Sequence, residues 1–300
     1  MHILVIGSKG FVGSHVVEYF SDRKYTVSGS DMSAPDGTEN YNYFNSGTGG
    51  AGLHEIFASI KPDICINAAG NGSVPVSLLN PQLDFEANVH FNFFLLELIR
   101  QYQPHCKYIY LSSAAVYGNP ISLPIKETDL IKPFSPYGWH KYLAELLCKE
   151  YAVLYNMNTV SLRVFSVYGP RLRKQIFWDT YQKMKKDGDI MLFGSGQESR
   201  DFIYIDDLME AINCILLKAN LTGQSVNVAS GTETSIDEAI QLFLQIAGNR
   251  KGIIYSHKNK PGDPINWRAN IDELTSYGFK NKVSLHNGLI NTIEWLKENA

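Results

Sequence analysis

Short, largely apolar runs alternate with longer segments of helical periodicity along the first half of the chain. Runs of this kind are typical of strands that are covered on both faces of a sheet. Their alternation with helices predicts an α/β fold built on a doubly wound parallel sheet of the Rossmann type. The five runs are HILVIG (2–7), YTVSGSD (25–31), DICINAA (63–69), KYIYLSS (107–113) and NTVSLRVF (158–165).

Beyond about residue 166 this alternation loosens. The stretches GSGQESRDFIYIDDL and KPGDPINWRANIDEL are rich in turn residues and isolated charges. We therefore predict a larger domain over residues 1–165, together with about 204–230. A smaller domain over 166–203 and 231–300 is expected to be interleaved with it.

Composition excludes several classes of function. The 300 residues are 44% hydrophobic, and 27 basic against 30 acidic residues give a formal net charge of -3. This balance provides no basic field for nucleic acid. The four cysteines lack metal-ligand spacing, so we expect buried reduced thiols and no metal. No run reaches the roughly 18 apolar residues of a membrane span, and the apolar start is too short for a signal peptide, which predicts no membrane partner and a cytoplasmic location.

The first strand leads directly into the glycine-rich motif GSKGFVG. Gly7 permits a tight turn, Gly10 permits close approach of a pyrophosphate, and Gly13 permits close packing of helix on strand. Asp31 ends the second strand, 18 residues after Gly13, where a carboxylate can accept hydrogen bonds from an adenosine ribose. Together these features favour NAD, although Lys9 inside the loop is a mild indication that a 2′-phosphate could be tolerated.

The motif SPYGWHK predicts the start of a helix that carries an acid/base pair. Ser135 suits the N-cap and Pro136 the first helical position, so Tyr137 and Lys141 lie one turn apart on the same face. A neighbouring cation and a helix N-terminus both favour a phenolate, which would lower the pKa of the tyrosine. Tyr-x-x-x-Lys also occurs by chance, and its position after a glycine loop is what gives it weight.

The fourth strand ends in two hydroxyls, at Ser112 and Ser113. Ligands of open parallel sheets bind outside the carboxyl ends of the strands, so these hydroxyls are expected in the cleft beside the cofactor. Ser113 could hydrogen-bond the oxygen that is being oxidised while Tyr137 takes its proton. For Ser112, a hydrogen bond to its own backbone is the favoured explanation.

These motifs resemble those of the extended short-chain dehydrogenase/reductase family, in its NAD-dependent epimerase/dehydratase group, whose members act on nucleotide sugars. GSKGFVGSH resembles the glycine loop of the family, NAAG its third-strand motif, and YLSSAAVYG and SPYGWHK its catalytic motifs. LRVFSVYGPR, RDFIYIDDL and NVASGTETSIDEA resemble later landmarks. The resemblance extends over nearly the whole chain and implies that the larger domain binds NAD and the smaller one a nucleotide sugar.

The resemblance also implies roles for individual residues. Ser113, Tyr137 and Lys141 would form the catalytic trio. Arg200 would grip the diphosphate of the sugar nucleotide, the alternative being an ion pair with Asp201 or Glu198. The cofactor would contact Gly7, Gly10, Phe11, Val12, Gly13, Asp31, Ala68, Ala69, Gly70, Asn88, Tyr137 and Lys141, and the substrate Ser73, Ser166, Arg200 and Lys260.

Two positions depart from the family pattern near the expected diphosphate. Ser166 stands where the family often has Asn, and Lys260 stands where it often has Arg. His140 is interpreted as a residue of the helix surface rather than a catalyst. The family's paired helices, here about 81–102 and 135–155, imply a homodimer, and the apolar character of 81–102 on more than one side suits a helix packed between the sheet and a partner.

The resemblance favours a nucleotide-sugar epimerase, acting at C4 through a transient keto sugar with return of the same hydride. A reductase of nucleotide-linked 4-keto-6-deoxyhexoses that consumes NAD(P)H is the alternative. An NAD-binding sensor without turnover is a third. Ala114 and Ala115 stand where dehydratases of the family carry acidic residues, so we predict no 4,6-dehydratase activity.

Overall fold

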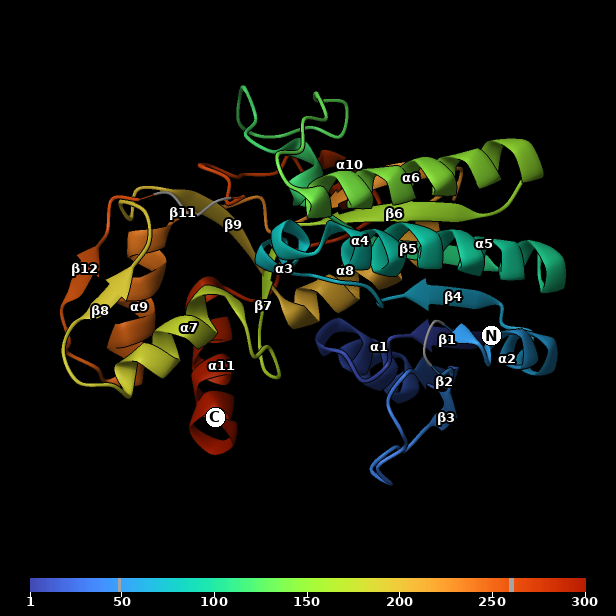
Figure 1. Cartoon of the computed structure of the whole chain (residues 1–300), viewed down its shortest axis with the longest axis horizontal. Helices are drawn as coiled ribbons and strands as arrows, with labels where there is room; N and C mark the ends of the chain where they lie inside the picture. Colours follow the sequence, from blue (N-terminus) through green and yellow to red (C-terminus); the bar gives the residue numbers. More distant parts are fainter. Residues whose placement is uncertain (48–49, 259–261) are drawn as a thin grey trace. The chain divides into compact units, whose positions relative to one another are not determined.

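The computed structural model describes residues 1–47, 50–258 and 262–300. The chain forms two compact units, which are described separately (Figure 1). The first unit contains residues 1–118, 131–164 and 216–226, and the second contains 119–130, 165–215 and 227–300.

A seven-stranded sheet is the framework of the first unit. Its strand order is β10-β6-β5-β4-β1-β2-β3, and the pairs from β6 to β3 are parallel. The doubly wound α/β prediction is therefore confirmed. All five predicted strands are present, and β3 and β10 are additional. The strands are β1 (His2–Ile6), β2 (Thr26–Asp31), β3 (Asn42–Asn45), β4 (Ile64–Asn67), β5 (Lys107–Ser113), β6 (Thr159–Val164) and β10 (Gln224–Val228).

Helices α2, α5 and α6 build one apolar core with this sheet. Leu53, Leu95 and Cys148 from these helices are fully buried, as are Leu4 and Tyr108 of the strands beneath them. All four cysteines of the chain are buried thiols, as predicted. The helices of this unit are α1 (Phe11–Asp22), α2 (Leu53–Ile60), α3 (Val74–Leu79), α4 (Pro81–Phe85), α5 (Phe91–Tyr102) and α6 (Pro136–Tyr155), with a 3₁₀ turn, η3 (Ala114–Tyr117).

The segment predicted as one helix over 81–102 contains a change of helical geometry. Its first turns, α4, and its last, α5, are α-helical, but Glu86–His90 between them form a π-helical turn, η2. Asn80 caps the segment by accepting a hydrogen bond from the backbone N–H of Leu83. The π turn contains the buried Asn88. Such turns often occur at functional sites, where they change the direction of a side chain.

In its described residues, the second unit combines two small sheets with five helices. One sheet has the order β11-β9-β7 and the other pairs β12 with β8. Tyr168, Phe177, Phe202 and Phe243 stack edge to face or face to face in its aromatic core. The elements are β7 (Ser166–Tyr168), α7 (Gln175–Met184), β8 (Ile190–Leu192), β9 (Ser199–Tyr204), α8 (Ile205–Lys218), β11 (Glu233–Ser235), α9 (Ile236–Ala247), β12 (Ile253–Tyr255), α10 (Asp272–Ser276) and α11 (Leu285–Asn299).

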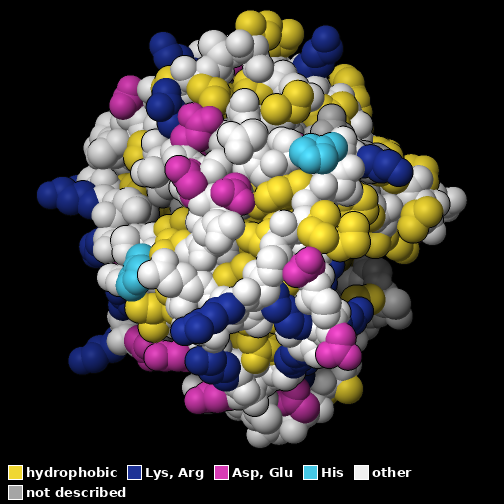
Figure 2. Space-filling model, turned by 90° about the vertical axis from the view of Figure 1, so that its left-hand side faces the viewer, with side chains coloured by type: hydrophobic (Ala, Val, Ile, Leu, Met, Phe, Trp, Pro, Cys, Tyr) yellow, Lys and Arg dark blue, Asp and Glu magenta, His cyan; other side chains and the backbone are white. Residues whose placement is uncertain are grey.

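The surface of the second unit around β8 and β12 is mixed in character. Figure 2 shows hydrophobic side chains on this face between basic and acidic ones. Met191, Phe193 and Ile254 are exposed hydrophobic residues on or beside these two strands. Within the described residues, no helix combines the length and apolarity needed to cross a bilayer.

Candidate active site

The glycine motif forms a backbone cradle between β1 and α1. Gly7 has a φ of +79°, and a Cβ there would lie 2.7 Å from the backbone nitrogen of Ala69. A Cβ on Gly13 would lie 2.0 Å from the carbonyl oxygen of Gly7. Gly10 donates its N–H to the same carbonyl, at 3.0 Å. Only glycine fits at the first and last positions, so backbone rather than side chains lines the N-terminal end of α1, as anion binding there requires.

A second feature of the first unit also fits a dinucleotide. The side-chain amide of Asn88 donates to Asp84 Oδ1 at 3.1 Å and to the carbonyl oxygen of Asn71 at 3.2 Å. Its own Oδ1 is buried and has no hydrogen-bond partner among the described residues. A Cβ on Gly70 would lie 2.5 Å from this oxygen, so glycine keeps the space in front of it open. A buried acceptor without a donor is costly, and the hydroxyl of a bound ligand would satisfy it.

Asp84, which the sequence analysis did not single out, connects this feature to α6. It is fully buried, and besides Asn88 it accepts from Asn71 Nδ2 at 2.6 Å. Its Oδ2 lies 2.6 Å from His140 Nδ1. His140 is therefore partly buried and bonded to Asp84, whereas the sequence predicted a residue of the helix surface. Asp84 thereby fixes Asn88 and the first turns of α6 relative to each other.

The structure brings Ser113, Tyr137 and Lys141 together at the carboxyl end of β5. Ser135 caps α6 by accepting from the N–H of Gly138 at 3.1 Å, which sets Tyr137 in the first turn. The hydroxyl of Tyr137 is hydrogen-bonded to Ser113. Lys141 Nζ donates to the carbonyl oxygen of Leu111 at 2.9 Å and lies 5.8 Å from the centroid of the Tyr137 ring.

The expected lowering of the tyrosine pKa is not found. Burial raises the pKa of Tyr137 to about 12, and the hydrogen bond from Ser113 offsets only part of this rise. The phenol is therefore protonated at neutral pH in this structure. It needs additional positive charge beside it before it can accept a proton.

A buried charge network lies one turn further along α6. Glu145 and Arg163 form an ion pair with 2.8 Å between Oε2 and Nη2, and their side chains are 4% and 6% exposed. Ser112 donates to Glu145 Oε1 at 2.5 Å and Ser225 to Oε2 at 3.0 Å, while Arg163 Nη1 donates to the hydroxyl of Tyr117 at 2.8 Å. Ser112 is therefore an anchor between β5 and α6, which explains the first of the two strand-end hydroxyls. The sequence signal for Glu145 was its position on α6, four residues after Lys141 and eight after Tyr137, which places the three residues on the same side of the helix.

Apart from Tyr137 and Lys141 on α6, the predicted cofactor residues lie at the carboxyl ends of β1, β2 and β4, in the first turn of α1 and in η2. Asp31 ends β2, and its carboxylate accepts from the N–H of Lys9 at 3.1 Å, so it lies beside the glycine loop. Ala68 continues the edge of β4 by donating to the carbonyl oxygen of Ile6 at 2.9 Å. Phe11 and Val12 open α1. Ser73, predicted to contact substrate, caps α3 by accepting from the N–H of Val76.

Two of the predicted substrate residues lie in one sheet of the second unit. Ser166 is on β7 and Arg200 on the neighbouring β9. Arg200 Nη1 donates to the carbonyl oxygens of Ser199 and Ile265, at 2.8 and 3.2 Å, and the guanidinium lies 5.8 Å from the ring centroid of Trp267. Lys260 lies outside the described residues.

The two carboxylates proposed as alternative partners of Arg200 are bound elsewhere. Asp201 accepts from Ser230, Gly231 and Ala269 at 2.7 to 3.1 Å. Glu198 accepts from the backbone of Ser195 and its neighbour in the preceding turn. Neither carboxylate forms a close ion pair with Arg200, although Glu198 and Asp263 lie near enough to offset part of the lowering of the Arg200 pKa by burial. The guanidinium, held through Nη1, is a candidate group for an anion.

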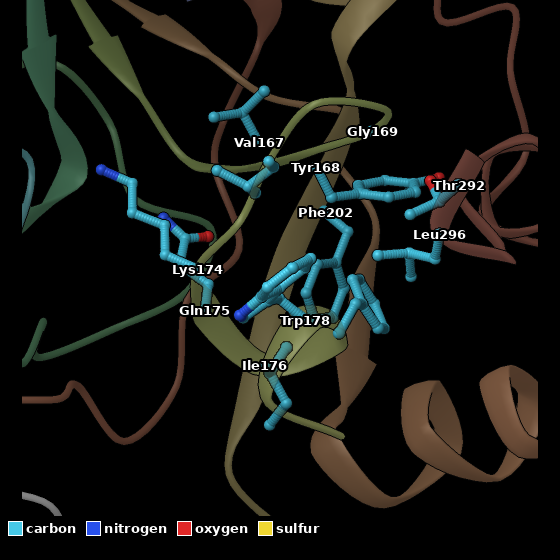
Figure 3. Close-up of a pocket in the computed structure, with 12 residues that line it drawn as sticks. Val167, Tyr168, Gly169, Lys174, Gln175, Ile176, Trp178, Phe202, Thr292 and Leu296 are labelled. Atoms are coloured by element: carbon cyan, nitrogen blue, oxygen red, sulfur yellow. The ribbon is translucent and has the colours of Figure 1, made fainter. Parts of the chain in front are cut away.

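The second unit also contains a small hollow, lined by residues of β7, α7, β9 and α11, with room for about one water molecule. Figure 3 shows Tyr168, Phe202 and Trp178 grouped on its wall, with Thr292 and Leu296 contributed by α11. Its walls are mainly apolar and aromatic, and it is too small to hold a nucleotide sugar. Among the residues that the structure describes, no group of three or more His, Cys, Asp or Glu is placed to hold a metal ion.

Comparison with known proteins gives relatives along the whole chain. Residues 3–229 match the description "NAD dependent epimerase/dehydratase family". The chain is 32% identical to a putative UDP-glucose 4-epimerase of Methanocaldococcus jannaschii, and the similarity covers 99% of both chains.

Solved structures of high similarity include two 4-epimerases. The UDP-glucuronic acid 4-epimerase of Bacillus cereus, in complex with UDP-glucuronic acid and NAD, has a TM-score of 0.91 and 27% identity over 100% of both chains. The UDP-glucose 4-epimerase of Thermotoga maritima, with UDP-glucose, has a TM-score of 0.91 and 28% identity over 99% of both chains. With a glycine cradle, an acidic residue ending β2 and a Ser-Tyr-Lys group at the end of β5, the chain belongs to the NAD-dependent epimerase/dehydratase family.

Proposed function

We propose that the protein is a nucleotide-sugar 4-epimerase in which Ser113, Tyr137 and Lys141 carry the acid/base chemistry. The observation that carries the proposal is the meeting of these side chains at the carboxyl end of β5, in the same unit as the glycine cradle. The relatives support epimerisation at C4 over the reductase alternative, because they include several UDP-sugar 4-epimerases. The presence of Ser113, Tyr137 and Lys141 at the three catalytic positions disfavours a sensor without turnover.

The cofactor is NAD, and when bound it supplies a hydride acceptor that can return the same hydride. The ionised form of Tyr137 would take the proton of the C4 hydroxyl as C4 gives up its hydride, which would leave a C4 ketone on the sugar. Lys141 Nζ lies 5.8 Å from the centroid of the Tyr137 ring, and its charge together with that of bound NAD would favour this ionised form. Ser113 would donate a hydrogen bond to the oxygen of the ketone. After the keto sugar turns in the site, return of the hydride to the opposite face of C4 would let Tyr137 give the proton back, so the reaction would be redox-neutral.

The residues after Ser113 favour this reaction over dehydration. Ala114 is fully buried and Ala115 donates its N–H to Ser113 Oγ at 3.2 Å, so the two alanines form the turn that holds the serine. Elimination of water from a hexose needs one group to remove a proton at C5 and another to protonate the leaving hydroxyl. Methyl side chains provide neither function, and we therefore propose that 4,6-dehydration is absent.

We assign NAD binding to the first unit and nucleotide-sugar binding to the second. In this assignment Arg200 and Ser166 bind the diphosphate, with Lys260 and Ser73 as further contacts. The relatives named above are UDP-sugar enzymes, which makes a UDP-hexose the favoured substrate class. Buried thiols and nucleotide-sugar chemistry support a cytoplasmic location.

We further propose a homodimer formed through α5 and α6. These helices pack against each other, and α6 carries exposed apolar side chains at helical spacing on one stripe. Trp139, Leu143, Leu146 and Val153 in this stripe are 38% to 65% exposed. When one face of a helix packs in the core and its other face carries exposed apolar side chains, that second face is typically covered by a partner.

Replacing apolar residues of this stripe with charged ones is expected to convert the dimer into a monomer. Sedimentation equilibrium should give about twice the 33.7 kDa chain mass for the unmodified protein and the chain mass for Leu143→Glu/Leu146→Glu. Met191→Glu, at an exposed apolar position of the second unit, is the matched control and should remain dimeric. A monomeric unmodified protein would contradict the assignment.

The proposed reaction is tested by offering the purified protein pairs of C4 epimers linked to UDP, GDP, CDP and dTDP. We expect one UDP-hexose to convert to its C4 epimer until the two reach equilibrium, with no net consumption of NAD(P)H. Oxidation of one equivalent of NAD(P)H per nucleotide-linked 4-keto-6-deoxyhexose, without any C4 epimerisation, would establish the reductase instead.

A further inference from the structure

Lys9, the basic residue of the glycine loop, is bound on several sides by the segment that follows β2. Its Nζ lies 2.7 Å from Glu39 Oε1 and 3.0 Å from Asp36 Oδ2, and it donates to the carbonyl oxygen of Ala34 at 2.9 Å. The ammonium also lies 4.7 Å from the centroid of the Tyr43 ring. An ammonium group can donate three hydrogen bonds, and the two carboxylates and the carbonyl oxygen supply three acceptors for them.

The two carboxylates are themselves fixed in place by the loop. Glu39 accepts from the backbone N–H groups of Asp36 and Gly37, at 3.1 and 3.0 Å. Asp36 accepts from the N–H of Thr38 at 3.0 Å. The side chain of Glu39 is only 9% exposed. The Asp36 side chain is 59% exposed. The hydrogen bonds from the loop backbone nevertheless hold both acids facing Lys9, so the ion pairs are a preformed part of the loop.

Asp31 adds a third carboxylate to the same place. It is bonded to the backbone of Lys9 and to Ser33, so the ribose-binding end of β2, the glycine loop and the 34–39 segment are joined. Three carboxylates against one ammonium leave about two negative charges here. In this fold the acid that ends β2 binds the ribose 2′-hydroxyl, whereas a 2′-phosphate needs a basic side chain that is free to approach it.

We propose that Asp36 and Glu39 act as an acidic clamp on Lys9 that excludes NADP, so that cofactor choice is shared by three carboxylates and does not depend on Asp31 alone. The clamp explains why a lysine in the glycine loop, which on its own would favour a 2′-phosphate, is compatible with NAD. It occupies the cation and adds repulsion toward the roughly two negative charges of a phosphate monoester.

The test measures NAD and NADP binding to nucleotide-free protein by calorimetry, with no sugar present. Asp36→Asn/Glu39→Gln is expected to tighten NADP binding at least about tenfold and to change NAD binding less than about threefold. Adding Lys9→Met should remove most of that gain, because the released ammonium is its main source. A net-charge control, Glu294→Gln/Glu298→Gln on α11, should leave both affinities unchanged.

A second variant keeps the test decisive if the double substitution disturbs the loop. Lys9→Met alone should change the NAD-to-NADP affinity ratio less than about threefold, since the clamp already withholds the lysine from a phosphate and only the added repulsion of one uncompensated charge remains. A loss of NADP affinity of about tenfold or more in this variant would show that Lys9 contacts the phosphate in the unmodified protein and would overturn the proposal. So would an unchanged ratio in a folded Asp36→Asn/Glu39→Gln protein, or a gain that persists in full without Lys9. Failure of the unmodified protein to bind NAD would instead contradict the proposed function.

Discussion

Replacing Tyr137 with phenylalanine is expected to lower the turnover number by about 10² or more while NAD still binds. The substitution removes only the hydroxyl, which is the group hydrogen-bonded to Ser113 and the acid/base of the proposed reaction. The backbone N–H of Tyr137, which donates to Ser77 Oγ at 3.1 Å, is retained, so the start of α6 should not move. The loss should therefore fall on turnover rather than on folding or cofactor affinity.

Turnover at saturating sugar nucleotide and NAD affinity by calorimetry measure the two sides of this prediction. Tyr142→Phe is the matched control, since it removes the same atom from the same helix one residue beyond Lys141, and it should retain most of the activity. Near-normal turnover of Tyr137→Phe would remove this residue from the mechanism and would contradict the proposed acid/base role.

Replacing Arg163 with methionine should destabilise the protein by about 3 to 5 kcal/mol. The substitution leaves the carboxylate of Glu145 buried without its cation, and burial of an unpaired charge is among the largest single costs in a fold. Two serine hydroxyls still donate to that carboxylate, but they do not neutralise it. Because Glu145 ties α6 to β5, we expect the loss of stability to be accompanied by a loss of turnover.

Urea unfolding of three variants separates this effect from a general loss of packing. Glu145→Gln in the Arg163→Met background should recover part of the stability, since a neutral amide is less costly to bury. It can accept from one of Ser112 and Ser225 through its oxygen and donate to the other through its NH2 group. Arg100→Met, which removes the cation of a more exposed ion pair with Glu97, should cost about 1 kcal/mol or less. A loss below about 1 kcal/mol for Arg163→Met, or a further loss on adding Glu145→Gln, would contradict the account of the network.

Features that depend on local pattern were predictable from the sequence. The five central strands follow from their apolar runs, and the turn at Gly7 and the cap at Ser135 follow from residue chemistry at fixed offsets. The strand β3 was not predicted, because its residues Asn42–Asn45 are half-buried or exposed and carry no continuous apolar run. The π turn around Asn88 was also missed, since a one-residue change in helical repeat leaves the hydrophobic pattern nearly unchanged.

What the sequence did not reveal depends on contacts between distant residues. Glu145 meets Ser112, Arg163 and Ser225 from three different parts of the chain, and only its spacing from Lys141 hinted at a role. The raised pKa of Tyr137 reflects burial, which a tyrosine's neighbours in sequence do not disclose. Lys9 suggested tolerance of a 2′-phosphate until the fold placed two acids against it.

The central claim, transient oxidation at C4 with return of the same hydride, is tested most directly by running the reaction in D₂O and examining the product by NMR. An epimerase of this kind exchanges protons only on oxygen, so we predict a C4 epimer that carries no deuterium on carbon. Incorporation of deuterium at C4 would show that the hydrogen passes through solvent, and a 6-deoxy-4-keto product labelled at C5 would show dehydration; either result would contradict the account.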